Sequence, residues 1–106
     1  MPDRETVKAR IDEIEVEMKR IGWWREEPPP QEAYDFHRAF AMDTMAFSQW
    51  LQFIFVPRVN QIIESDEQFP THSSVGAQAV REFDGDPDAS HLCSLLSQFD
   101  HLIERG

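Results

Sequence analysis

The apolar residues near the start of the chain recur at intervals of three and four, and this spacing constrains the fold more than any other feature. Such spacing places the side chains on one face of an α-helix. Asp3 or Thr6 is a suitable N-cap, and Gly22 is a typical stop signal. The sequence therefore predicts a first helix with an apolar stripe of Val7, Ile11, Ile14, Met18 and Ile21.

This stripe is narrow, with about one apolar residue per turn, whereas a helix that covers a core usually has a broader apolar face. A narrow stripe is typical of a coiled-coil seam. We therefore expect the first helix either to pack edge-on against the rest of the chain or to share its stripe with a second copy in a homodimer.

Three consecutive prolines, Pro28 to Pro30, follow the first helix and forbid a helix at that point. They favour an extended and stiff connection. Trp23 and Trp24 come just before the prolines. Either these rings cover the end of the core, with each indole N–H bound to a carbonyl, or one of them is an exposed anchor for a partner.

Residues 31–42 are expected to form a loop or a short helical turn, with Phe36 and Phe40 directed inward. A second long helix is then predicted to start with Asp43 or Thr44 as its N-cap. Its apolar residues form a broad face, which is typical of a helix at the centre of a domain. They stand at positions 47, 50, 51, 54, 55, 59, 62 and 63.

Pro57 lies inside the second long helix. A proline there removes the hydrogen bond to the carbonyl of Phe53 and is expected to kink the helix. Alternatively, the helix ends near Val56 and a new helix begins with Pro57 at its first position. We favour one kinked helix.

The last third of the chain predicts a short helix and a long helix after a connection at residues 65–74. The short helix is expected at residues 76–83. Asp86 is suited to cap the last helix, with Pro87 at its first position. The apolar face of that helix consists of Leu92, Leu95, Leu96, Phe99, Leu102 and Ile103.

Together these elements predict an all-α fold in a single domain, residues 1–106. The chain shows no strand-like alternation and no internal repeat. A chain of this length with 41% apolar residues has room for one core. We expect a small helical bundle of three long helices plus one short helix, with the second long helix kinked at Pro57.

The net charge of −10 argues against direct binding of nucleic acid. A protein that binds phosphates needs clustered positive charge to release their counterions. The basic residues of the first helix alternate with acidic ones, as on a solvated face. Direct RNA binding by stacking on Trp23 and Trp24 is therefore only a third functional hypothesis.

The single cysteine, Cys93, cannot form an internal disulfide, and the chain begins without an apolar targeting segment. We therefore expect a cytoplasmic protein. The longest uncharged stretch, residues 44–57, is shorter than the ~20 residues that span a bilayer, so no membrane partner is expected.

The sequence contains no pattern that predicts catalysis or metal binding. The four histidines lack the spacing of a zinc site. The aspartates at 84, 86 and 88 resemble the start of a calcium loop, but Leu95 stands where a glutamate is needed. No serine lies in a Gly-x-Ser-x-Gly motif, and no glycine-rich phosphate loop is present. We expect a non-enzymatic protein without cofactor or metal.

One cluster in the second long helix mixes large apolar residues with Gln49, Gln52 and Arg58. Arginine beside aromatic rings is the composition of an interface hot spot. The structural alternative is a capped and kinked core helix. If the cluster is a binding face, the predicted partner contacts are Trp24, Arg25, Trp50, Gln52, Phe53 and Arg58.

Several short motifs of the chain are specific enough to be compared with a known family. They are Trp24-Arg25 with Glu27 and Pro29, Phe40, Met42-Asp43-Thr44-Met45, Gln49-Trp50-Leu51-Gln52-Phe53 and Pro57-Arg58. On these motifs the chain resembles the YqcC-like family of small bacterial proteins over residues 5–105. The resemblance implies an all-helical domain whose gene lies beside that of tRNA pseudouridine synthase C. It implies no catalytic residues.

Two functional hypotheses of different classes follow. The first is an interaction protein that assists a partner enzyme, such as tRNA pseudouridine synthase C, through charge complementarity. The second is a small-ligand or sensor bundle, which requires a pocket of ~300 Å³ or more between its helices.

Overall fold

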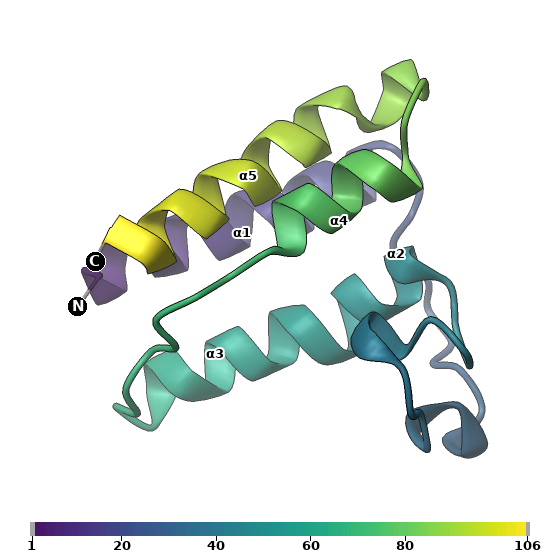
Figure 1. Ribbon diagram of the computed structural model, residues 1–106, viewed down its shortest axis with the longest axis horizontal. Coiled ribbons are helices and arrows are strands. Elements are labelled where there is room, and N and C mark those ends of the chain that lie inside the picture. Colours follow the sequence, from purple (N-terminus) through teal and green to yellow (C-terminus); the bar gives the residue numbers. More distant parts are fainter. Residues whose placement is uncertain (1, 106) are drawn as a thin grey trace.

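The computed structural model describes residues 2–105, and every regular element in this part of the chain is helical. The α-helices are α1 (Arg4–Arg20), α2 (Phe47–Trp50), α3 (Val56–Glu64), α4 (Val75–Glu82) and α5 (Ser90–Arg105). A π-helical stretch (Leu51–Phe55) joins α2 to α3 into one central helix, residues 47–64. The predicted bundle of three long helices and one short helix is confirmed (Figure 1).

Helix α1 packs within the chain against α5 and the central helix (Figure 1). The carboxylate of Asp3 accepts a hydrogen bond from the backbone N–H of Thr6 at 3.1 Å and caps the helix. The stripe from Val7 to Met18 is fully buried, so none of these side chains is left for a second copy. Of the two expectations for the narrow stripe, the structure shows edge-on packing within one chain.

The central helix begins at Phe47, so the predicted N-caps Asp43 and Thr44 were wrong. The Gln49 side chain accepts a hydrogen bond from the backbone N–H of Ala46 at 2.9 Å, which satisfies one group at the helix start. Asp43 and Thr44 are instead used by the preceding turns, where local hydrogen bonds compete with helix formation.

Pro57 lies inside the central helix, and helical backbone angles continue through Phe55 and Val56. The backbone N–H of Val56 donates to the carbonyl of Leu51, five residues back, as in a π-helix. A π-turn of this kind is a recognised cause of a kink. The favoured prediction was one helix kinked at Pro57. The helix does continue through Pro57, and its irregular hydrogen bonding lies just before the proline, at Leu51–Phe55.

Asp100 joins α5 to the start of α4. Its carboxylate accepts hydrogen bonds from the Ser73 hydroxyl (2.5 Å) and from the backbone N–H groups of Val75 (3.0 Å) and Gly76 (2.8 Å). These bonds satisfy N–H groups that a helix start would otherwise leave unpaired. Helix α4 starts one residue earlier than the predicted 76–83.

The turn before α5 agrees with the prediction. The Asp86 carboxylate accepts a hydrogen bond from the backbone N–H of Asp88 at 3.0 Å. Pro87 opens a short 3-10 turn (Pro87–Ala89) that leads directly into α5. Among the described residues, no helix is long and apolar enough to cross a membrane.

Gly76 gives the first testable prediction. A Cβ atom at this position would lie 2.5 Å from the Ser97 Cα and 2.6 Å from the Ser97 backbone nitrogen, and neither atom moves without shifting α5. Gly76→Ala is therefore expected to lower the free energy of unfolding by about 1–3 kcal/mol, measured by urea denaturation. In an uncrowded helix the same change stabilises the fold by about 0.5–1 kcal/mol. A stabilising effect would therefore contradict the close approach of α4 and α5 at Gly76.

Candidate partner-binding surface

The six residues predicted to contact a partner do not form one cluster in the structure. Arg25 and Gln52 are hydrogen-bonded to each other, and Trp24, next to Arg25 in the chain, packs against the core. Trp50 and Arg58 instead line a cleft beside the central helix. Phe53 is half-buried in the π-helical stretch. The sequence motif therefore combines residues that serve different parts of the fold.

Gln52 is buried and holds the chain at Arg25. Its side-chain oxygen accepts a hydrogen bond from the Arg25 backbone N–H at 2.8 Å, and its side-chain nitrogen donates to the Arg25 carbonyl at 2.6 Å. Both polar ends of the amide are thus satisfied, as a buried amide requires. Gln52 fixes the backbone from which the exposed Arg25 side chain extends.

The two tryptophans after α1 are both half-buried against the core. The Trp23 ring centroid lies 4.8 Å from that of Phe83. The Lys19 ammonium group lies over the Trp24 ring, 5.3 Å from its centroid, within the range of a cation–π contact. Each ring therefore covers the core on one side and is open to solvent on the other.

Trp50 connects the central helix to the preceding turns. Its ring stacks on Phe47 (centroids 5.6 Å apart, 12° between planes) and on Phe55 (5.5 Å, 24°). Phe40 meets it edge-on at 5.0 Å and 85°. These are favourable aromatic arrangements. The inward direction predicted for Phe40 is confirmed by these contacts.

The segment of residues 31–45, called the exposed segment below, places large apolar side chains in solvent. Tyr34 is 41% exposed, Phe36 37% and Met42 44%, so the prediction that Phe36 turns inward was wrong. Among the described residues, two other large apolar side chains are exposed, Val16 on α1 and Val80 on α4. Apolar side chains gathered on one exposed stretch are typical of an interaction site.

The backbone of the exposed segment is strained at two adjacent residues. Phe40 (φ +58°) and Ala41 (φ +53°) have left-handed angles that cost residues other than glycine about 1–3 kcal/mol each. Ala41 is fully buried, and the Thr44 hydroxyl donates to the Ala33 carbonyl at 2.6 Å. The surrounding contacts therefore impose this conformation, and such strain is often found at functional sites.

Asp43 also fixes the shape of the exposed segment. Its carboxylate accepts hydrogen bonds from the backbone N–H groups of His37 (3.0 Å) and Arg38 (3.4 Å). The bond from His37 is the main reason that the pKa of Asp43 lies below its ordinary value. The carboxylate is therefore ionised at neutral pH.

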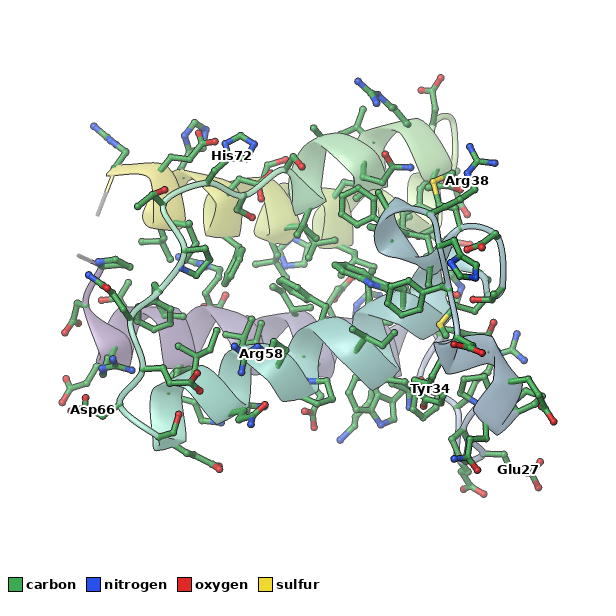
Figure 2. All side chains as sticks on the ribbon, turned by 60° about the horizontal axis from the view of Figure 1, so that its bottom comes forward. Glu27, Tyr34, Arg38, Arg58, Asp66 and His72 are labelled. Carbon is green, nitrogen blue, oxygen red and sulfur yellow. The ribbon has the colours of Figure 1, made fainter. Side chains whose placement is uncertain are left out.

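The charge around the exposed segment is predominantly negative. Residues 25–45 include five acidic and two basic side chains. Glu27, Tyr34 and Arg38 lie at the same end of the molecule, away from Asp66 (Figure 2). A segment that is apolar and lies among acidic residues of the sequence is suited to a partner surface that is basic and partly apolar.

The groups that carry reactive chemistry are dispersed. Within residues 2–105, no three His, Cys, Asp or Glu side chains lie close enough together to hold a metal ion. Cys93 is half-buried, and burial, with a smaller effect of Asp86, raises the pKa of its thiol. A thiol with a raised pKa is a poor nucleophile at neutral pH, because the thiolate is the reactive form.

Comparison with known proteins identifies the family. Residues 6–102 match the model of the domain family DUF446, whose description is tRNA pseudouridine synthase C. The chain belongs to this family. An uncharacterised protein of Haemophilus influenzae is 29% identical over 83 residues, which cover 76% of this chain and 78% of that protein. The uncharacterised protein YqcC of Escherichia coli is 25% identical, over 78% of this chain and 72% of YqcC.

A solved structure has the same fold. The solution NMR structure of Escherichia coli YqcC superimposes with a TM-score of 0.85, over 98% of this chain and 90% of that chain, at 22% identity. The resemblance to the YqcC-like family seen in the sequence motifs is thus confirmed, as is the all-helical fold that it implied.

One relative is much longer than this chain. The tRNA pseudouridine synthase C of Pectobacterium carotovorum is 31% identical over 64 residues. These residues cover 60% of this chain but 17% of that protein. The similar region is therefore a small part of a polypeptide that bears the name of a tRNA-modifying enzyme.

Gln52 gives the second testable prediction. Gln52→Leu keeps the approximate size of the side chain but removes its two hydrogen bonds to the N–H and the carbonyl of Arg25. We expect the free energy of unfolding to fall by about 1–3 kcal/mol and the Arg25 amide to lose its protection from hydrogen exchange. Gln68→Leu, a change at an exposed glutamine, is the matched control and should leave both measurements unaltered.

Proposed function

We propose that this protein is a non-enzymatic accessory protein of tRNA pseudouridine synthase C, and that it binds the enzyme through the exposed segment and the adjoining Trp24 and Arg25. Two residues of the central helix support this surface: Gln52 through its hydrogen bonds to the Arg25 backbone, and Trp50 through its contact with the Phe40 ring. Phe53 and Arg58 lie on the central helix and are not assigned to this surface.

The longer relative from Pectobacterium is the observation that carries the proposal. In that protein, a segment similar to this chain is part of a longer polypeptide that bears the name tRNA pseudouridine synthase C. A covalent link keeps two parts at a high effective concentration. Where the same two parts are separate chains, they need an interface of their own to work together.

Charge supports the choice of an RNA-modifying enzyme as the partner. An enzyme that binds tRNA needs a basic surface to displace counterions from the phosphates. The present chain has a net charge of −10, and the exposed segment lies in an acidic region. Opposite charges favour rapid and specific association of the two proteins. An accessory protein of this kind works in the cytoplasm, where tRNA is modified.

The apolar side chains supply the stabilising contacts of the proposed interface. Tyr34 and Met42 are exposed in the free protein, so their burial against a partner removes apolar surface from water. The strained turn at Phe40 and Ala41 is already held in place before binding. Little ordering entropy is therefore lost when the complex forms.

Tyr34 and Met42 provide the test. We expect Tyr34→Ala and Met42→Ala each to weaken binding of the purified synthase from the same organism at least ~10-fold, measured by calorimetry. Val16→Ala, at an exposed apolar residue of α1, is the matched control and should bind like the unaltered protein. Absence of a complex at micromolar concentrations would contradict the proposed partner, and equal weakening by all three changes would contradict the proposed surface.

A further inference from the structure

A cleft of about 310 Å³ lies between the central helix on one side and α5 with the connection to α4 on the other. Five aromatic rings line it: Phe40, Trp50, Phe55, Phe69 and Phe99. Ligand pockets in proteins are mostly apolar and have volumes of roughly 300–1,000 Å³. The cleft therefore meets the size that the hypothesis of a ligand-binding bundle requires.

Two ionisable residues line the cleft, Arg58 on α3 and His72 in the connection before α4. No aspartate or glutamate of the described residues is among the lining. This is unusual in a chain with 20 acidic and 10 basic residues. Figure 2 shows Arg58 and His72 on opposite sides of the space between α3 and the C-terminal helices.

Arg58 makes exposed contacts that another anion can replace. Its guanidinium group donates to the Gln61 side-chain oxygen at 3.2 Å and lies 3.4 and 3.5 Å from the two Glu67 carboxylate oxygens, and its side chain is 53% exposed. An exposed pair of this kind contributes little to stability. His72 has a closer contact, with its Nδ1 atom 2.9 Å from Glu104. Arg58 is therefore the side chain that can turn to a ligand at low cost.

We propose that the cleft binds a small aromatic molecule with one anionic group. The ring would lie among the five aromatic side chains, where edge-on and stacked contacts are favourable. The anion would be bound by Arg58, whose planar guanidinium group matches a carboxylate in geometry and charge. This inference rests on the cleft alone and does not depend on the proposed partner enzyme.

The test uses 1-naphthoate as the probe and 1-naphthamide as its neutral counterpart, each titrated into the full chain by calorimetry and NMR. Naphthoate is expected to bind with a Kd of roughly 1 mM or tighter and to shift the Trp50 indole N–H resonance. Naphthamide, which has the same ring without the charge, is expected to bind ~10-fold more weakly. No binding of naphthoate, or resonance shifts outside the cleft, would overturn the proposal.

Variants separate the charge from the apolar lining. Arg58→Gln should weaken naphthoate ~10-fold and leave naphthamide unchanged, whereas Arg81→Gln, an exposed arginine of α4 outside the cleft, should change neither. Ile54→Trp should fill the cleft and abolish binding of both probes. If Ile54→Trp fails to fold, the two arginine variants still test whether Arg58 binds the anion. Equal naphthoate affinity in Arg58→Gln and Arg81→Gln would contradict that role.

Discussion

The stacking of Trp50 on Phe47 and Phe55 is the interaction on which both proposed sites of this protein depend. Phe55 is five residues beyond Trp50, and residues five apart do not stand one above the other in an ordinary α-helix. The π-helical stretch from Leu51 to Phe55 widens the turn and brings these two rings into stacking contact. The irregularity before Pro57 thus organises the aromatic cluster.

The aromatic cluster contacts both the exposed segment and the apolar cleft. Phe40, one of the strained residues of the exposed segment, packs edge-on against Trp50. The Phe40 and Trp50 rings both line the apolar cleft. The apolar cleft and the exposed segment therefore share the Phe40 ring.

Local patterns in the sequence predicted the helices well because each helix depends on interactions between near neighbours. The α1 stripe, the Asp3 cap and the Asp86–Pro87 turn are all determined within a few residues. The start of the central helix was predicted wrongly because Asp43 has competing partners, the backbone N–H groups of His37 and Arg38, which form only in the folded turn. A good N-cap residue is equally suited to a tight turn.

The candidate site was predicted in part. The sequence singled out Arg25 and Gln52, but their connection through a buried amide joins residues 27 apart and has no local pattern. By itself the sequence determined the helical class and the negative charge, because periodicity and composition fix these. Only the tertiary structure decided which apolar residues stay in solvent, where the cleft lies and which side chains line it, because these follow from how the helices pack against one another.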